Sequence, residues 1–240
     1  MSPRRVVITG AAGGIGAALA ASSLRRGDSV FALDIAARPK ALAGIEWIEC
    51  DVTDERQVAD AAARVDAIAG GADVLFNNAG TRFPASGFLD TAPAQWRATL
   101  ETNATGPFLV AQAFARGMAA AGRGVIVNTV SQLAEAVVPG HTAYAASKAA
   151  LKHLTAYAAA ELGPLGIRVI GVAPGIVETA MTQELSTDPE WVRARTQRIP
   201  LGRFASPAEI AESMHELASE SFAYAHGTTV VLDGGYLTSR

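Results

Sequence analysis

A tyrosine and a lysine, four positions apart in the segment AYAASKAALK, have the clearest catalytic potential in this sequence. On a helix, residues four apart lie on one face, so the Tyr144 phenol and the Lys148 ammonium would be neighbours. Ser131 follows the apolar run GVIVNTV and would stand at the carboxyl end of a strand, where open α/β sheets bind ligands. Together they would supply a proton-transfer group, a positive charge and a hydroxyl donor. The alternative interpretation is a packed tyrosine beside a solvated lysine.

The lysine matters because tyrosine is a poor base near neutral pH. Its ordinary pKa is about 10, and lowering that pKa by ~3 units requires about 4 kcal/mol of preferential stabilisation of the phenolate. One ammonium at ~4 Å, with an effective dielectric constant of about 20, supplies about that much. A single lysine at position 148 is therefore sufficient in principle to make Tyr144 a general base.

The stretch TGAAGGIG, residues 9–16, follows the apolar run RRVVI directly. A flexible spacer would stand between domains, whereas this stretch stands between the first expected strand and the first expected helix. There Gly10 would allow a tight turn, Gly14 close approach to the backbone, and Gly16 close packing of helix on strand. Free N–H groups at the helix start would then face a pyrophosphate. Asp34, 18 residues after Gly16, ends the second expected strand and would bind an adenosine ribose.

Short β-branched runs alternate with longer alanine-rich segments, which predicts an α/β fold with a doubly wound parallel sheet of about seven strands. The expected strands are residues 4–9, 29–34, 45–50, 74–79, 124–130, 167–173 and 228–233. The expected helices are residues 15–26, 54–68, 93–121, 142–162, 178–198 and 206–219. Thr53 and Ser206 are the expected N-caps. Only ten residues separate Asp34 from Ile45, so a loop or a single turn is expected there. Residues 1–240 are interpreted as one domain, without repeat or linker.

With these motifs in order, the sequence resembles the short-chain dehydrogenase/reductase family over essentially its whole length. The family's glycine pattern, its DV pair, its NNAG motif, its segment beside the nicotinamide and its DGG ending are matched by residues 9–16, 51–52, 77–80, 174–179 and 233–235. Ser131 also precedes Tyr144 by thirteen residues, the family's usual spacing. The resemblance implies a Rossmann-type fold and hydride transfer between a nicotinamide cofactor and a secondary alcohol or ketone of a small, cyclic substrate.

The resemblance also implies roles for single residues. Tyr144 would be the general acid and base, Lys148 would lower its pKa and bind the nicotinamide ribose, and Ser131 would donate to the carbonyl or alkoxide oxygen. Asn103 would hold a water on the proton path to Lys148. The implied cofactor-binding residues are Gly10, Gly14, Ile15, Gly16, Asp34, Asp51, Val52, Asn77, Ala79, Gly80, Tyr144, Lys148, Pro174, Gly175, Val177 and Thr179.

The residues around the second strand favour NAD over NADP as the cofactor. Asp34 would repel a 2′-phosphate, Ile35 after it is uncharged, and Gly13 stands where a compensating base would be needed. Arg38 is the one nearby cation, and it would weaken the preference if the short connection folds back.

Two basic residues stand close in sequence to the expected pocket. Arg82 follows the NNAG motif and His141 lies three residues before Tyr144, so both would sit on the rim of the substrate site and bind a carboxylate. The alternative is a surface arginine and a solvated loop histidine. Several segments also resemble the subgroup that oxidises 2,3-dihydro-2,3-dihydroxybenzoate. Neutral sugars, polyols and cyclic ketones remain open as substrates.

Two further features concern the lid and the assembly. Met181, Leu185 and Trp191 would form a substrate lid near residues 178–200, or alternatively a helix packed on the body. The alanine-rich helix at 142–162 has small residues nearly all round, which is typical of a helix buried on several sides. With the helix at 106–121, it suits the homotetramer interface that the resemblance implies.

Composition excludes several classes of protein. A formal net charge of −3 without a clustered basic excess speaks against nucleic acid and anionic membranes as partners. The single cysteine, Cys50, and four scattered histidines give no metal-ligand spacing. A strand-like run that begins at Arg4 leaves no room for a signal peptide, and the least polar stretch, 11–24, is too short to span a membrane. A soluble cytoplasmic protein is expected.

Two alternatives to this dehydrogenase interpretation fit the sequence less well. A non-catalytic redox sensor that binds NAD(H) would not need Tyr144 and Lys148, yet the full tetrad is present. An epimerase or dehydratase of the extended family needs a longer C-terminal substrate domain than the roughly 60 residues after PGIVET allow. An active oxidoreductase is therefore predicted.

Overall fold

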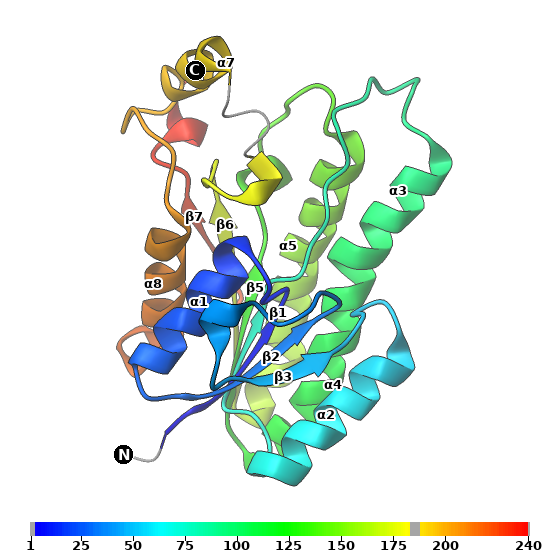
Figure 1. Ribbon diagram of the computed structural model, residues 1–240, viewed down its shortest axis with the longest axis vertical. Helices are drawn as coiled ribbons and strands as arrows, with labels where there is room; N and C mark the ends of the chain where they lie inside the picture. Colours follow the sequence, from blue (N-terminus) through cyan, green and yellow to red (C-terminus); the bar gives the residue numbers. More distant parts are fainter. Residues whose placement is uncertain (1–2, 183–187, 240) are drawn as a thin grey trace.

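In the computed structural model, which describes residues 3–182 and 188–239, seven parallel strands form one sheet (Figure 1). The strands are β1 (Arg5–Thr9), β2 (Ser29–Asp34), β3 (Glu46–Glu49), β4 (Val74–Asn77), β5 (Gly124–Thr129), β6 (Ile167–Pro174) and β7 (Thr229–Leu232). Their order across the sheet is β3-β2-β1-β4-β5-β6-β7. The predicted doubly wound parallel sheet is confirmed. The order reverses between β1 and β4, and ligands bind at such a switch point, beyond the carboxyl ends of the strands.

Helices cover both faces of the sheet, as Figure 1 shows. α1 (Gly14–Arg25) and α8 (Pro207–Leu217) pack on one face, and α2 (Glu55–Ala69), α4 (Gly106–Ala121) and α5 (Thr142–Leu162) pack on the other. The central residues of β1 are all apolar because both faces of the strand are buried. Val6 and Ile8 point to the α1–α8 side, whereas Val7 points to the opposite core. A strand buried on both faces has no polar side to alternate with.

The segment expected as one helix over 93–121 consists of three parts. α3 (Pro93–Leu100) is followed by a π-helical turn, Glu101–Thr105, and then by α4. The turn contains the buried Asn103. π-helical insertions of this kind are frequent at functional sites.

The sequence placed one N-cap correctly and one wrongly. Ser206 caps α8 in a capping box with Glu209, as predicted. At α2 the cap is Asp54 and not Thr53, because the Asp54 carboxylate accepts from the backbone N–H groups of Arg56 and Gln57. The Thr53 hydroxyl instead donates to Asp51, at 2.8 Å.

Two connections bear on the predictions. The short link from β2 to β3 contains only a 3₁₀ turn, Lys40–Leu42, so the expected single turn is confirmed. The helix expected over 178–198 is not continuous in the described residues: 180–182 are helical, Asp188 is not, and α7 covers Pro189–Thr196. Asp188 caps α7 by accepting a hydrogen bond from the Glu190 N–H. Pro189 lies in the first turn, where proline is favoured because its φ already suits a helix and no N–H is needed.

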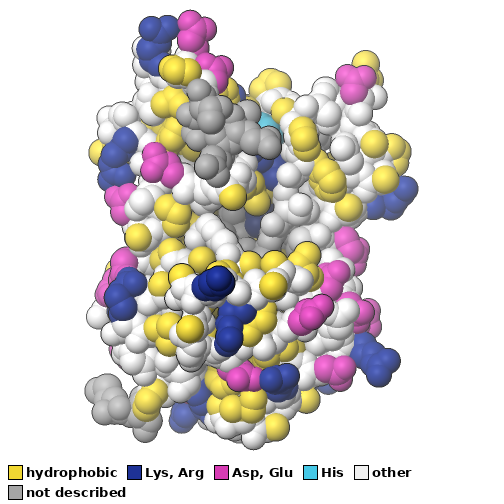
Figure 2. Space-filling model, viewed as in Figure 1, with side chains coloured by type: hydrophobic (Ala, Val, Ile, Leu, Met, Phe, Trp, Pro, Cys, Tyr) yellow, Lys and Arg dark blue, Asp and Glu magenta, His cyan; other side chains and the backbone are white. Residues whose placement is uncertain are grey.

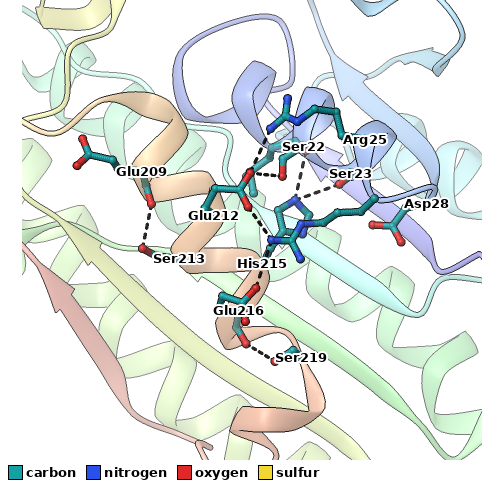
Figure 3. A network of polar contacts seen from close by, with 12 residues as sticks. Ser22, Ser23, Arg25, Asp28, Glu209, Glu212, Ser213, His215, Glu216 and Ser219 are labelled. Atoms are coloured by element: carbon teal, nitrogen blue, oxygen red, sulfur yellow. Dashed lines mark hydrogen bonds and ion pairs between the residues drawn. The ribbon is translucent and has the colours of Figure 1, made fainter.

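A polar seam joins α1 to α8 (Figure 3). Glu212 accepts from the Ser22 hydroxyl at 2.6 Å and from the Arg26 guanidinium at 2.6 Å. Beneath them the buried His215 ring lies 3.3 Å from the Ser23 hydroxyl, and burial lowers the pKa of His215. The seam holds α1, the helix that follows the glycine-rich stretch, against the body.

The described part of the chain has neither a helix suited to a membrane nor a cluster of metal ligands. None of its helices is long and apolar enough to cross a membrane. Within residues 3–182 and 188–239, no three or more His, Cys, Asp or Glu side chains are grouped so that they could hold a metal ion.

Candidate active site

The glycine-rich stretch forms a backbone surface that side chains would fill. Gly10 and Gly14 have φ values of 65° and 55°, which favour glycine. A Cβ on Gly16 would overlap the Gly10 carbonyl oxygen, so helix and loop can pack this closely only without a side chain. The result is an open cradle of N–H groups at the start of α1. This cradle fits the pyrophosphate of a dinucleotide.

A cavity of about 670 Å³ extends from this cradle across the carboxyl ends of the strands. Such a volume is typical of a ligand site. Figure 2 shows the hollow near the centre of the face in view, with basic side chains visible in its depth. The predicted cofactor residues that line it are Gly10, Gly14, Ile15, Asp34, Asp51, Val52, Ala79, Gly80, Tyr144, Lys148, Pro174, Gly175, Val177 and Thr179.

Two predicted cofactor residues, Gly16 and Asn77, are not among the lining residues and lie behind the cavity. The Asn77 side chain donates to the Pro107 carbonyl in the core, at 2.7 Å. The asparagine that serves the loop is the next one, Asn78, whose amide nitrogen donates to the Thr9 carbonyl at 3.2 Å. The Thr9 hydroxyl in turn accepts from the N–H groups of Asn78 and Ala79. The NNAG motif therefore braces the glycine-rich stretch against β4.

Asp34 is fixed at the far end of the cavity. Its two carboxylate oxygens accept from the backbone N–H groups of Ala12, at 2.7 Å, and Ala36, at 2.9 Å. Arg38 does not line the cavity; its guanidinium lies 3.4 Å from the Ile45 carbonyl. The negative charge at this end of the cavity is thus held in place, and the neighbouring cation is turned toward the backbone.

Tyr144, Lys148 and Ser131 meet at the other end of the cavity. The Lys148 Nζ lies 5.8 Å from the centroid of the Tyr144 ring and donates to the Thr129 carbonyl at 2.7 Å. Burial lowers the pKa of Lys148 to about 8. Burial also raises the pKa of Tyr144, although a hydrogen bond with Ser131 and the charge of Arg82 lower it. Lys148 and the other protein groups are therefore not enough by themselves to bring the pKa of Tyr144 down to near neutral pH, because desolvation opposes ionisation of the phenol.

Asn103 lies directly behind these residues. Its Oδ1 accepts from the Thr81 N–H at 2.7 Å, and its Nδ2 donates to the Thr81 carbonyl and to the Ser147 hydroxyl. Ser147 in turn donates to the Tyr144 carbonyl at 2.7 Å. Asn103 thus connects the strand carrying the NNAG motif with the helix carrying Tyr144. Ser147 was not singled out from the sequence, since a serine inside a helix gives no signal of its own.

Comparison with known proteins agrees with this geometry. A family model described as "Enoyl-(Acyl carrier protein) reductase" (adh_short_C2) matches residues 10–237. The chain belongs to the short-chain dehydrogenase/reductase family. It is an NAD(P)-dependent oxidoreductase that acts on CH–OH groups. Its fold matches the crystal structure of a short-chain dehydrogenase/reductase from Mycobacterium marinum with a TM-score of 0.91 and 34% identity, over 98% of this chain and 96% of the other.

Two curated relatives act on ring alcohols by name. The chain is 39% identical to the cis-4-hydroxycyclohexanecarboxylate dehydrogenase of Sinomonas cyclohexanicum, over 97% of this chain and 96% of the relative. It is 34% identical to the cyclopentanol dehydrogenase of Comamonas sp. (strain NCIMB 9872), over 96% of each chain.

The two basic residues expected at the rim of this dehydrogenase differ in their placement. Arg82 lines the cavity, and its guanidinium donates to the Met181 carbonyl at 2.8 Å. His141 is the partly buried N-cap position of α5 and is not among the lining residues. Burial and the charges of Arg82 and Arg195 lower the pKa of His141.

The three residues predicted to form a substrate lid differ in where they lie. Met181 lines the cavity. Trp191 instead packs on the body, with its ring centroid 5.8 Å from that of Phe204. Leu185 lies outside the described residues. α7 is therefore attached through an aromatic contact, and it brings Arg195 close enough to affect His141.

Proposed function

We propose that this protein is an NAD-dependent dehydrogenase that oxidises the secondary alcohol of a small cyclic substrate. One observation carries the proposal. A single cavity joins a backbone cradle and a fixed carboxylate at one end to Tyr144, Ser131 and the buried Lys148 at the other. The two ends match the two ends of a dinucleotide that delivers or accepts a hydride.

In this proposal each residue of the site has a stated task. Tyr144 takes the proton of the alcohol, and Ser131 donates a hydrogen bond to the same oxygen. Lys148, held by the Thr129 carbonyl, places a positive charge behind the phenol and binds the nicotinamide ribose. Asn103 and Ser147 position α5, and Asn103 holds the relay water. A bound oxidised nicotinamide would supply the hydride acceptor.

The preference for NAD rests on Asp34. With both oxygens held by backbone N–H groups, this carboxylate is positioned to accept from the hydroxyls of a ribose and to repel a 2′-phosphate. Arg38, turned to the Ile45 carbonyl, does not offset the charge. NADP would therefore bind more weakly.

A ring fits the substrate end of the cavity better than a polyol does. Besides the catalytic groups, that end is lined by the apolar side chains of Phe83, Leu133, Ile176 and Met181. A polyol would leave several hydroxyls without partners there, whereas a ring buries apolar carbon. The relative that acts on a hydroxycyclohexane acid, at 39% identity, supports a ring, and relatives named for D-threitol and galactitol, both at 38% identity, make a polyol the comparison to test.

The test is turnover of NAD⁺ with cyclopentanol, cyclohexanol, 4-hydroxycyclohexanecarboxylate and an open-chain polyol such as threitol, followed by NADH absorbance. We expect ring alcohols to be oxidised and the polyol to react at least about tenfold more slowly, which corresponds to one unpaired polar group. Tight NADH binding without turnover of any alcohol or ketone would instead identify a redox sensor. Faster turnover of the polyol would reject the ring.

We also propose that the protein assembles as a homotetramer through α4 and α5. A groove of about 560 Å³ runs between these helices on their outer side and is lined by apolar side chains that include Phe108, Leu154 and Leu165. Two of its lining side chains, Tyr157 and Phe108, are exposed. A second copy of the same helix pair would cover this surface.

A further inference from the structure

The side chain of Gln132, the residue directly after Ser131, has a buried oxygen without a hydrogen-bond partner. Gln132 is only 5% exposed, and its Oε1 accepts no hydrogen bond from the described residues. In that part of the chain two other buried side-chain atoms lack a partner, Asn128 Oδ1 and His215 Nδ1, and neither residue lines the cavity that holds Tyr144. Gln132 does line it. Because buried polar atoms are nearly always paired, an unpartnered oxygen in the wall of a ligand cavity is exceptional.

The backbone of Gln132 is held in place, so its side chain starts from a fixed point. Gln132 opens a 3₁₀ turn, Gln132–Ala134, which the Ser131 hydroxyl oxygen caps by accepting from a backbone N–H, at 3.2 Å. The Gln132 carbonyl accepts from the N–H groups of Glu135, at 3.0 Å, and Ala136, at 2.9 Å. The turn that places the catalytic hydroxyl therefore also places the amide.

The Gln132 amide reaches from the loop after β5 to the segment after β6. A Cβ on Gly175 would lie 3.1 Å from the Gln132 Oε1, so the amide packs against bare backbone there. The backbone N–H groups around this point are already used. Gly175 donates to the Leu232 carbonyl at 2.9 Å, and Gly235 donates to the Asp233 carboxylate at 2.8 Å. The donor that Oε1 lacks is therefore to be sought in a ligand.

A water is a poor partner for this oxygen. A water buried in a protein typically makes about three hydrogen bonds. The residues that follow Gln132 and Gly175 along the wall of the cavity, Leu133 and Ile176, are apolar and would give it none through their side chains. A donor carried by the substrate fits better, because the ring to which it is attached packs on the same apolar side chains.

We propose that Gln132 accepts a hydrogen bond from a second hydroxyl group of the substrate, which is a cyclic diol with that hydroxyl on a carbon next to the reacting one. The inference rests on the proposed function, since it concerns the substrate of the same site. Ser131 and Gln132 are consecutive residues that both line the cavity, which favours recognition of oxygens on neighbouring ring carbons. One acceptor matches one additional hydroxyl, whereas an open-chain polyol would still leave others without partners.

The test compares cis- and trans-1,2-cyclohexanediol with cyclohexanol as substrates of the wild type and of Gln132→Met. We expect the wild type to prefer the better diol isomer over cyclohexanol in kcat/KM by at least about tenfold, the effect of pairing one buried polar atom. Gln132→Met keeps the size of the side chain and removes the acceptor. Its kcat/KM should therefore fall much more for the diol than for cyclohexanol, mainly through a higher KM. Gln95→Met, at a half-buried glutamine of α3 that is not among the residues lining the cavity, is the matched control and should keep the preference.

A binding measurement separates this inference from the proposed function. Calorimetry of the protein–NADH complex with each diol and with cyclohexanol needs no turnover, because NADH cannot reduce an alcohol further. Tighter binding of a diol, lost in Gln132→Met and kept in Gln95→Met, supports the inference even if no alcohol is oxidised. Equal binding of both diols and cyclohexanol by the wild type, or an unchanged preference in Gln132→Met, overturns it. In that case oxidation of cyclohexanol would leave the proposed function standing.

Two further measurements test other tasks for the amide. The affinity of Gln132→Met for NADH, from fluorescence titration, should stay close to that of the wild type. Weaker NADH binding with equal losses on diol and cyclohexanol would assign the amide to the cofactor and overturn the proposal. A lower thermal midpoint of Gln132→Met with the same equal losses would make the amide a structural group and would overturn it as well.

Discussion

The surroundings of Tyr144 shift the pKa of its phenol in opposite directions. Burial raises the pKa of the phenol, whereas the Ser131 hydrogen bond and the charge of Arg82 lower it. Lys148 is itself buried, so its pKa falls to about 8 and its charge is partly lost as the pH approaches that value. The protein groups therefore leave the phenol protonated near neutral pH, and the positive charge of the bound cofactor is needed in addition.

We expect Tyr144→Phe to reduce turnover by at least about 10²-fold, because only the proton-transfer group is removed. NADH binding should stay close to that of the wild type, as measured by fluorescence titration. Alcohol oxidation needs the phenolate, so its rate should rise with pH through the ionisation of Tyr144. Lys148→Met should move this rise to higher pH and weaken NADH binding as well. A variant at Tyr144 that kept most activity would rule out this mechanism.

Cofactor choice is a second property that one or two residues determine. Asp34→Ala combined with Ile35→Arg removes a held carboxylate and adds a cation beside the exposed edge of the cavity. We expect the ratio of kcat/KM for NAD⁺ to that for NADP⁺ to fall by about 100-fold or more, as expected for exchanging a repulsive for an attractive charge. Steady-state kinetics with both cofactors check this. An equal or lower KM for NADPH than for NADH in the wild type would contradict the assignment.

The elements that carry these residues were largely predictable from local signals. Strand runs such as SVFALD are apolar on both faces, and the capping box at Ser206 depends on residues three apart. What could not be predicted depends on competition or on distant packing. Asp54 replaced Thr53 as a cap because Asp51 binds the threonine hydroxyl. The placement of α7 on the body depends on the contact of Trp191 with Phe204, which are thirteen residues apart in the sequence.

The site residues likewise divide into those that local spacing predicts and those that it does not. Spacing placed Ser131, Tyr144 and Lys148 together, and the glycines produced the expected cradle. Within NNAG the sequence does not distinguish Asn77 from Asn78, because neighbouring residues point to opposite sides; in the structure Asn77 donates into the core and Asn78 to the glycine-rich stretch.

The seam between α1 and α8 should make stability depend on pH. The pKa of His215 in the folded protein lies below its ordinary value of about 6.5, so the unfolded chain binds more protons below that pH. The stabilisation from neutral His215 is complete above about pH 6.5 and is lost as the pH falls. The free energy of unfolding of His215→Gln, from urea titrations, should therefore change less between pH 7 and pH 5 than that of the wild type.

Other titratable groups also contribute to the pH dependence of the free energy of unfolding. His141 also has a lowered pKa and titrates over the same range, so His141→Asn serves as the comparison. Glu209 and Glu212 have pKa values lowered to about 2, and their contribution is lost only at more acidic pH. An unchanged pH dependence in His215→Gln would show that the seam does not respond to the histidine.

At the scale of the whole molecule, α5 has two tasks that lie on opposite sides of one helix. Lys148 and Ser147 face the body and are buried, whereas Ala150 and Tyr157 face outward. The outward side, with Phe108 of α4, presents large apolar side chains that an isolated subunit would leave in water. A subunit contact through α4 and α5 would therefore stabilise the helix that holds Tyr144 in place.

Ala150→Arg tests this coupling, because it puts a long charged side chain on the outward side of α5 without touching the cavity. We expect the variant to elute from size-exclusion chromatography with light scattering as dimers or monomers at micromolar concentration, while the wild type elutes as a tetramer. Ala63→Arg, at an exposed alanine of α2 away from the groove, should leave the mass unchanged. Because α5 loses its cover on dissociation, the thermal midpoint of Ala150→Arg should also fall and should depend less on protein concentration than that of the wild type. A monomeric wild type would rule out this assembly.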